Sequence, residues 1–342
     1  MSVNSLETVA KAMVAPGKGI LAADESTGTI EKRFRSIHVE NTEEHRRAYR
    51  DLLFSAKGIG QHIGGVILFD ETLRQKSADG TPFPELLAQH GVIPGIKVDT
   101  GAKEMALCPG ETVTEGLDGL TKRCAEYLKL GARFAKWRAV ITIGAGIPSQ
   151  ACITANAHAL ARYAAICQAA GLVPIVEPEV LMDGDHTIER CEEVTEWTLR
   201  DQFAALASQR VAFERMVLKP SMVVAGASCK QQASVSEVAE RTLKVLRRTV
   251  PAAMPGIAFL SGGQGDELAT AHLNAINKLG GGPWTLSFSY GRALQAAALK
   301  AWKGGPTNVA AAQRAFIHRA RMNGLACQGR YSPDLERQAL AA

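Results

Sequence analysis

Short runs of apolar, often β-branched residues alternate with longer segments of helical periodicity along almost the whole chain. The runs occupy 20–23, 66–69, 95–98, 133–137, 173–176, 216–218, 257–260 and 285–288. Between several of them the apolar period becomes that of a helix. Residues that share a face are 117, 120, 124 and 128, then 160, 163, 164 and 167, and finally 235, 238, 243 and 246. About eight strand and helix pairs without a long linker predict parallel βαβ units of the α/β class.

Two architectures fit this α/β pattern, a closed (β/α)8 barrel and an open doubly wound sheet. A doubly wound sheet usually carries a glycine-rich turn after its first strand, where this chain reads Ala-Asp-Glu-Ser at 23–26. Gly144-Ala-Gly146 lacks a third glycine and runs on to Pro148, which is typical of a loop. We therefore predict a single (β/α)8 TIM-barrel domain over residues 1–342, with a short C-terminal segment that begins near residue 327.

The composition is that of an ordinary globular protein, because 46% of the 342 residues are hydrophobic and 21% are charged. Lys and Arg number 39 against 34 Asp and Glu. The resulting charge of +5 is too small to indicate nucleic-acid binding and suits an anionic small-molecule substrate. No apolar run approaches the roughly 20 residues of a membrane helix, and residues 1–15 lack a signal-peptide core. We expect a cytoplasmic protein that binds neither nucleic acid nor membrane.

Cysteine and histidine spacing gives no sign of a metal or a disulfide framework. The seven cysteines are scattered and never spaced as C-x-x-C, and the eight histidines are dispersed. Asp183-Gly-Asp185-His186 comes nearest to a ligand cluster, but it is more typical of a polar turn. We expect reduced cysteines and no metal or other cofactor.

Charged and polar side chains follow the predicted strands at their carboxyl ends. In chain order they are Asp24, Lys97, Asp99, Lys136, Arg138, Glu177, Glu179, Lys219 and Ser261. This end of the strands carries the active site in (β/α)8 barrels. Members of the pairs 97/99, 136/138 and 177/179 are two residues apart, so each pair faces one side of its strand. Such groups follow six of the eight strands, which predicts an active site there.

Lys219 is the candidate nucleophile, because it follows Val217-Leu218 in an apolar segment. Burial disfavours a charged amine, and a nearby second ammonium, that of Lys136, should lower its pKa further. A neutral amine is the form that attacks a ketone to give a Schiff base. The alternative is a lysine that simply emerges at the end of its strand.

Three carboxylates are candidates for proton transfer. Glu177, the nearer to its apolar run, is the candidate general acid and base. Glu179 is either a second catalytic carboxylate or a partner that neutralises nearby cations. Asp24 is either a supporting carboxylate or the N-cap of a helix that begins near Ser26.

Two groups of residues are suited to phosphate. Ser261-Gly-Gly-Gln-Gly265 offers backbone amides and a hydroxyl, and Ser289-Tyr-Gly291-Arg292 adds a helix N-terminus and a guanidinium. Phosphate sites after the seventh and eighth strands recur in this barrel class. The second group contains Lys32, Arg33, Lys97 and Arg138. Lys32-Arg33 alone is equally typical of a solvated helix face.

Long motifs in one order resemble the class I fructose-bisphosphate aldolases. The matching segments are 21–28 (LAADESTG), 63–69 (IGGVILF), 95–99 (GIKVD), 134–138 (FAKWR), 173–179 (VPIVEPE), 218–220 (LKP), 259–264 (FLSGGQ), 288–294 (FSYGRAL) and 327–329 (CQG). The resemblance extends from Leu6 to Pro333. It implies a metal-independent lyase of glycolysis and gluconeogenesis that cleaves fructose 1,6-bisphosphate, and it implies a homotetramer.

The resemblance also implies roles for individual residues. Lys219 forms the iminium with the C2 ketone, Glu177 serves as acid and base, Asp24 assists at the C4 hydroxyl, and Lys136 assists carbinolamine formation. The C1 phosphate lies on Ser261, Gly262, Ser289, Gly291 and Arg292. The C6 phosphate lies near Ser26, Lys32, Arg33, Lys97 and Arg138. The last tyrosine is Tyr331, so the family's C-terminal tyrosine is missing here, and Glu177 and water are the candidate proton donors to the enamine.

Other readings keep the barrel but change its use. A Schiff-base aldolase of this kind can take fructose 1-phosphate or sedoheptulose 1,7-bisphosphate, and transaldolases share the chemistry. Two phosphate sites favour a bisphosphate over a monophosphate. A non-catalytic scaffold on the same fold predicts losses at the strand ends, whereas the expected residues are present there.

Overall fold

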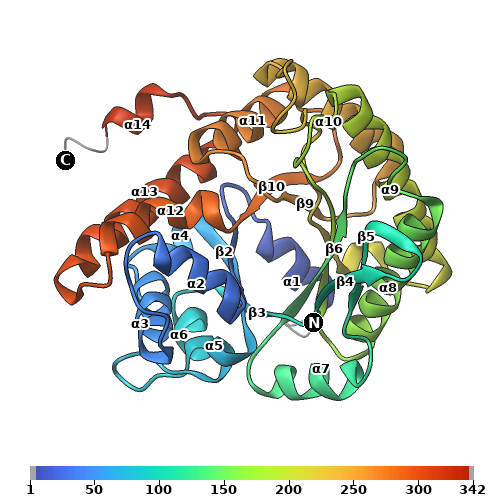
Figure 1. Ribbon diagram of the computed structural model, residues 1–342. Coiled ribbons are helices and arrows are strands. Elements are labelled where there is room, and N and C mark those ends of the chain that lie inside the picture. The colour runs from blue at the N-terminus through green and yellow to red at the C-terminus, as the bar shows by residue number, and fades with distance from the viewer. Residues whose placement is uncertain (1–4, 339–342) are drawn as a thin grey trace.

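The computed structural model describes residues 5–338, in which eight parallel strands close into a barrel surrounded by helices (Figure 1). The strands follow each other around the barrel in the order β1-β10-β9-β8-β7-β6-β3-β2. Their bounds are β1 (Gly19–Ala23), β2 (Ile63–Leu68), β3 (Ile93–Lys97), β6 (Phe134–Ile141), β7 (Val173–Val180), β8 (Val217–Leu218), β9 (Gly256–Phe259) and β10 (Thr285–Tyr290). The predicted (β/α)8 barrel is confirmed, and the doubly wound alternative is wrong because the first and last strands pair.

Helices cover the outside of the barrel. They are α2 (Thr27–Arg35), α3 (Glu43–Phe54), α4 (Ile59–His62), α5 (Asp70–Arg74), α6 (Phe83–Gln89), α7 (Leu120–Lys129), α8 (Gln150–Ala169), α9 (Ile188–Ser208), α10 (Val235–Thr249), α11 (Asp266–Leu279), α12 (Arg292–Trp302), α13 (Val309–Ala326) and α14 (Asp334–Gln338). Short 3-10 turns lie at Phe213–Arg215 and Pro306–Asn308. No helix within residues 5–338 is long and apolar enough to cross a membrane.

The apolar periodicity of the sequence correctly predicted most of the residues on the buried faces of the helices. All four predicted positions on α8 (160, 163, 164 and 167) are buried, as are three of the four on α10. Leu117 lies outside α7, which begins at Leu120 after a left-handed Gly119. Side-chain oxygens of Ser149, Thr187 and Ser234 accept the N–H of a residue in the first turn of α8, α9 and α10, which fixes where these helices begin.

Helix α1 (Leu6–Met13) closes the amino-terminal end of the barrel, and Figure 1 shows it across the middle of the ring. Its residues pack into the interior cluster, whose members include Ala10, Met13, Ile20, Ile67, Phe134, Val173, Ile175, Val217 and Ala258. The starts of β2 and β9 touch the end of this helix, because the sites of Gly64 and Gly256 abut Met13 and Val14. Only the opposite, carboxyl end is therefore left for a site.

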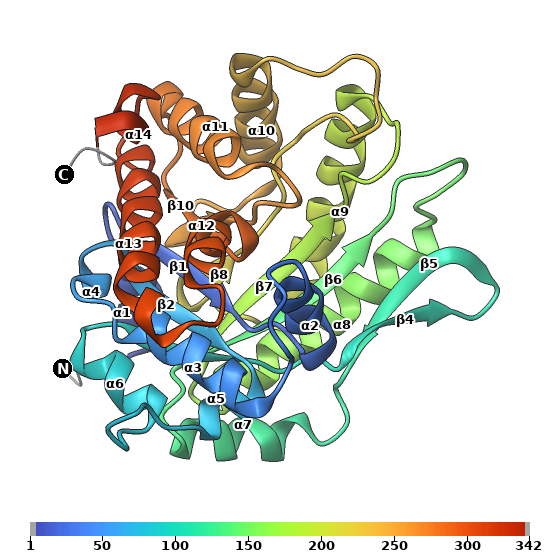
Figure 2. The same cartoon turned by 60° about the vertical axis from the view of Figure 1, so that its left-hand side comes forward.

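A two-stranded hairpin that the sequence did not predict interrupts the alternation. It consists of β4 (Gly101–Met105) and β5 (Cys108–Glu115), and Figure 2 shows it extending away from the barrel. Its residues are mostly polar on both faces, so no apolar alternation marks it. At its base the Thr114 hydroxyl donates to the backbone carbonyl of Arg138, 2.7 Å away. The hairpin is thereby attached to β6, the strand that carries the predicted site residues Lys136 and Arg138.

Replacing Gly64 by alanine should destabilise the barrel without changing its chemistry. The new Cβ would lie 2.6 Å from the Met13 carbonyl oxygen and 2.9 Å from that of Ala12, so backbone must move. We expect a loss of about 1–3 kcal/mol in the free energy of unfolding, measured by urea denaturation. Gly28→Ala on exposed α2 is the control, because its Cβ meets nothing within 4 Å, and it should stabilise by up to about 1 kcal/mol. Equal effects of the two substitutions would contradict this account of how α1 packs.

Candidate active site

Three buried charged groups, Lys136, Glu177 and Lys219, form a continuous row with the partly buried Asp24 at the carboxyl end of the barrel. Glu177 of β7 lies between two amines, with Oε1 3.0 Å from Lys219 Nζ and Oε2 3.4 Å from Lys136 Nζ. Lys136 of β6 is in turn 2.7 Å from Oδ2 of Asp24, which follows β1. Lys219 directly follows β8. The structure therefore brings together the predicted nucleophile, Lys136 and two of the three predicted carboxylates in one cluster.

Strand pairing explains why these side chains meet. β6, β7 and β8 are neighbours in the barrel, with Lys136 opposite Ile175 and Val176 opposite Leu218. Lys219 follows β8, as predicted, whereas Lys136 and Glu177 lie within β6 and β7, which continue to Ile141 and Val180 and so are longer than the apolar runs indicated. Lys136, Glu177 and Lys219 are each at most 4% exposed, so water screens their charges little.

The interleaved carboxylates keep the amine and the acid of this row charged. Burial by itself lowers the pKa of Lys136, but Asp24, Glu177 and Asp99 outweigh it and raise that pKa above its ordinary value. Burial likewise opposes ionisation of Asp24, yet Lys136 and Lys219 hold the pKa of this carboxyl well below its usual range. The expectation that neighbouring ammonium groups depress each other's pKa is thus wrong for Lys136, because carboxylates lie next to it.

A second group forms on β3, β6 and β7. Arg138 pairs with Glu179 two residues beyond Glu177, and the amide N–H of Arg138 also donates to Asp99 Oδ2 at 3.3 Å. Lys97 Nζ contacts both Asp99 Oδ1, at 2.6 Å, and its backbone carbonyl, at 2.8 Å. Burial raises the pKa of Glu179, with Arg138 opposing and Glu177 reinforcing the rise. Glu179 therefore sits as the partner of a cation, although the sequence also allowed a catalytic role.

A third group gathers where β9 and β10 end. Gly262 and Gly263 adopt left-handed backbone, and a Cβ on Gly263 would lie 3.6 Å from Arg292 Nη2. Ser261 is buried beside this turn, and the buried hydroxyl of Ser289 has no hydrogen-bond partner in residues 5–338. Gly291 caps α12, so amides, hydroxyls and a guanidinium converge at one helix N-terminus.

The predicted second cationic group is divided in the structure. Lys97 and Arg138 stand on adjacent strands, whereas Arg33 lies across the barrel mouth, where a Cβ on Gly291 would be 3.6 Å from Arg33 Nη2. Three strands separate β6 from β10 in either direction around the barrel. Lys32 is exposed on α2, and Ser26 precedes this helix with its hydroxyl 3.1 Å from that of Thr29. Arg33 thus belongs with the β9–β10 group, because α2 follows β1, the neighbour of β10.

The sequence did not single out the residues that hold Arg33. Glu25, next to Asp24, is buried and pairs with Arg33, with Arg50 of α3 and, at 2.9 Å, with Gln295 Nε2 of α12. A buried acid needs such partners, but these come from 25 and 270 positions away along the chain. Only the acidic pair after the first strand was a visible signal.

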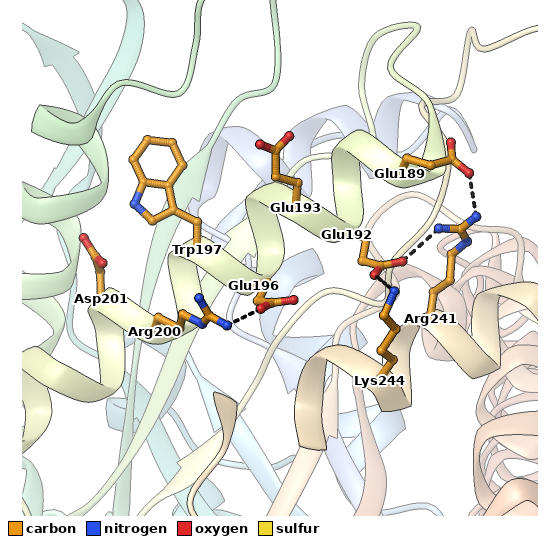
Figure 3. A pocket seen from close by; sticks show the side chains of 9 residues that line it. All are labelled: Glu189, Glu192, Glu193, Glu196, Trp197, Arg200, Asp201, Arg241 and Lys244. Atoms are coloured by element: carbon orange, nitrogen blue, oxygen red, sulfur yellow. Dashed lines mark hydrogen bonds and ion pairs between the residues drawn. The ribbon is translucent and has the colours of Figure 1, made fainter. Parts of the chain in front are cut away.

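A groove elsewhere on the surface contains none of the predicted site residues. Figure 3 shows it between α9 and α10, with Trp197 at one side and ion pairs across it. Glu192 there pairs with Lys244 and, at 2.8 Å, with Arg241. Within residues 5–338 no group of three or more His, Cys, Asp or Glu side chains is placed to hold a metal ion.

A parallel (β/α)8 barrel with buried amines and carboxylates at the carboxyl end of its strands is the architecture of a barrel enzyme. Residues 5–342 match the model of the glycolytic family described as fructose-bisphosphate aldolase class-I. The chain belongs to this family. It is accordingly an enzyme, a lyase that acts on fructose bisphosphate, and the identification made from the sequence motifs is confirmed.

Relatives and a solved structure agree over nearly the full length. A probable fructose-bisphosphate aldolase class 1 of Xanthomonas campestris pv. campestris is 62% identical, covering 97% of this chain and 99% of the relative. Fructose-bisphosphate aldolase 1 of Toxoplasma gondii is 58% identical over 94% of this chain and 89% of its own. A Plasmodium falciparum fructose-bisphosphate aldolase, solved with TRAP and a small-molecule inhibitor, superposes with a TM-score of 0.95 at 52% identity, covering 96% and 95% of the two chains.

A buried histidine behind the β9 turn should make stability depend on pH. His272 Nδ1 lies 2.6 Å from Gln264 Oε1, in the turn that carries Ser261, and burial lowers the pKa of His272 to about 4. As the pH falls below about 6.5, His272 therefore becomes protonated in the unfolded chain but stays neutral in the folded chain. The contribution of His272 to the free energy of unfolding is fully present above pH 6.5 and is lost as the pH falls toward 4. The loss from this group amounts to up to about 3 kcal/mol.

Comparing His272→Gln with wild type by urea denaturation between pH 4 and pH 7 measures this contribution. The variant should lose stability less steeply as the pH falls. His158→Gln, on the exposed face of α8, should keep the wild-type slope. Parallel slopes for wild type and His272→Gln would show that His272 is not the group responsible.

Proposed function

We propose that this enzyme cleaves fructose 1,6-bisphosphate through a Schiff base on Lys219, without a metal ion. The observation that carries the proposal is the position of Glu177, whose two oxygens contact Lys219 and Lys136 in a buried cluster. Such a carboxylate can take a proton from the Lys219 ammonium, which frees the amine for attack on the C2 ketone. The resulting carbinolamine loses water, protonated by Glu177, to give the iminium.

The iminium then accepts the electrons of the carbon–carbon bond. A carboxylate removes the proton of the C4 hydroxyl, the C3–C4 bond breaks, and glyceraldehyde 3-phosphate leaves while an enamine forms on Lys219. We assign this proton transfer to Glu177, with Asp24 as its partner at the hydroxyl. Protonation of the enamine at C3, by Glu177 or water, and hydrolysis of the iminium release dihydroxyacetone phosphate. Each step reverses, so the same groups condense the two triose phosphates.

Lys136 acts in this scheme as a fixed cation. Its raised pKa keeps it charged, so it stabilises the carboxylates of Asp24 and Glu177 and the oxyanion that develops at C2. Lys136 Nζ lies 2.7 Å from a carboxylate oxygen of Asp24, whereas Lys219 Nζ lies 3.0 Å from its carboxylate partner, Glu177. This difference supports Lys219 rather than Lys136 as the nucleophile.

The two phosphates of the substrate are assigned to opposite sides of the barrel mouth. We place the C1 phosphate at the β9–β10 end, on Ser261, Gly262, Ser289, Gly291 and Arg292, with Arg33 added to this set. The unpartnered Ser289 hydroxyl supports the assignment, because a buried donor of this kind needs an acceptor. We assign the C6 phosphate to Lys97 and Arg138, the latter held by Glu179. Ser26 and Lys32, which the resemblance also implies for this phosphate, come from α2 and its N-cap on the β1 side of the mouth, so we assign them only outer contacts.

The family membership further supports a homotetramer that works in the cytoplasm, in glycolysis and gluconeogenesis. Light scattering on the purified protein tests the assembly, since a tetramer has four times the 36.5 kDa of one chain. A mass of one or two chains would contradict the tetramer and leave the chemistry above unaffected.

Borohydride reduction in the presence of dihydroxyacetone phosphate should attach the triose to Lys219, as read by peptide mass mapping. A chelator should change neither trapping nor cleavage. Lys219→Arg should abolish the adduct and lower kcat/KM by at least about a thousandfold, because a guanidinium stays protonated. Lys230→Arg, an exposed lysine, is the matched control and should behave as wild type. An adduct on Lys136, or loss of cleavage with chelator, would overturn the mechanism.

Substrate preference should separate the two phosphate sites. Arg138→Ala should raise KM for fructose 1,6-bisphosphate by about 10- to 100-fold, the value of one charge-assisted contact, and leave KM for fructose 1-phosphate within about twofold. Arg292→Ala should raise both KM values alike. Steady-state kinetics on the two substrates measures the split. If Arg138→Ala impaired both substrates equally, the assignment of the C6 phosphate would be wrong.

A further inference from the structure

A buried ionic network lies directly beside the proposed C1 phosphate site and takes no part in the proposed chemistry. Its centre is Glu25, whose side chain is only 4% exposed. The neighbouring residue Asp24 faces Lys136 inside the barrel, whereas the Glu25 carboxylate bonds three side chains of the surrounding helices. These partners are Arg33 of α2, Arg50 of α3 and Gln295 of α12.

The network holds more positive than negative charge. Arg33 and Arg50 share the single carboxylate of Glu25, and Gln295 is neutral, so one positive charge remains. Burial opposes the ionisation of Glu25, but the two guanidinium groups, Arg50 foremost, hold its pKa below the ordinary value. Arg50 is buried and also lies over the Tyr49 ring, 5.7 Å from its centre. An uncompensated cation at such a site favours an anion nearby.

Arg33 is the member of the network that reaches the substrate side. Its side chain is 21% exposed, against 3% for Arg50, and its Nη1 bonds Glu25 while Nη2 lies beside Gly291. Gln295 fixes this arrangement from the other side. Its Nε2 donates to the Ala22 carbonyl at 2.7 Å as well as to Glu25, so the first turn of α12 is attached to the end of β1.

We propose that Glu25 is a positioning residue that holds the Arg33 guanidinium against Gly291, so that it meets the C1 phosphate already oriented. Arg50 and Gln295 fix Glu25 in turn, one by charge and the other by its link between β1 and α12. A guanidinium bound in advance loses less conformational freedom when the phosphate arrives. This inference rests on the proposed function, because it requires that a phosphate binds at the end of β10.

Kinetics of Glu25→Gln test the proposal. Released from the carboxylate, Arg33 should orient less well, so KM for fructose 1,6-bisphosphate and for fructose 1-phosphate should both rise about tenfold. The value of kcat and the borohydride trapping at Lys219 at saturating triose phosphate should change less than about threefold. Inorganic phosphate, as competitive inhibitor, should weaken in parallel with KM. Glu31→Gln is the matched control on the same helix, since Glu31 pairs with exposed Arg35 at the surface.

A double-mutant cycle separates positioning from general damage to the fold. Arg33→Ala alone should raise both KM values by about 10- to 100-fold. If Glu25 acts through Arg33, adding Glu25→Gln to Arg33→Ala should raise KM by no more than about twofold beyond that. Should Glu25→Gln fail to fold, Glu25→Gln with Arg50→Met removes the buried charge pair together, and the same cycle applies to this double substitution.

The outcomes distinguish this inference from the proposed function. Two results overturn the positioning role alone. In the first, Glu25→Gln still raises KM tenfold when Arg33 is already alanine. In the second, Arg33→Ala raises KM but Glu25→Gln does not. No effect of Arg33→Ala on either substrate overturns both this inference and the place of Arg33 in the phosphate site. Borohydride trapping on the wild-type enzyme tests the proposed Schiff-base mechanism independently of either result.

Discussion

The alternation of charge along Lys219, Glu177, Lys136 and Asp24 is the constraint on which the active end of the barrel depends. None of these groups would be tolerated in the interior alone, because a buried charge without a partner costs several kcal/mol, on the order of 3–5. Each is stabilised by the opposite charge next to it. The row spans β6, β7, β8 and the end of β1, so it exists only in the closed barrel. Stability and chemistry are therefore supplied by the same contacts.

Pairing of opposite charges is also found around the mouth of the barrel, where carboxylates hold the cations that face the substrate. Glu179 holds Arg138, Asp99 holds Lys97, and Glu25 holds Arg33. In each case a more buried acid fixes a more exposed base, as with side chains of 9% and 43% exposure for Glu179 and Arg138. A flexible cation would lose much of its freedom on binding phosphate, and the paired acid removes that loss in advance. The rim is preorganised on both sides of the barrel mouth.

The barrel and the residues of the central row could be predicted from the sequence, because the signals that mark them are local. A short apolar run followed by a charged residue indicates where a strand reaches the active end of the barrel, and Lys136, Glu177 and Lys219 each come after such a run, although β6 and β7 continue beyond the first two. Contacts between distant segments could not be predicted. Nothing near Arg33 in sequence indicates that it faces Gly291 rather than Arg138, since this depends on β1 pairing with β10. The β4–β5 hairpin was not predicted, because both of its faces are mostly polar and show no alternation of apolar residues.

Closure of the barrel through β1 and β10 also has a consequence during synthesis. β1 acquires its first neighbour, β2, when residues 63–68 have been made, but its other edge stays unpaired until residues 285–290 leave the ribosome. For most of translation the nascent chain therefore presents the exposed, apolar edge of Gly19–Ala23, and such edges pair readily with other chains. The last strand both completes the active end of the barrel and pairs with β1 and β9, so that no edge of the barrel sheet is left open to another chain.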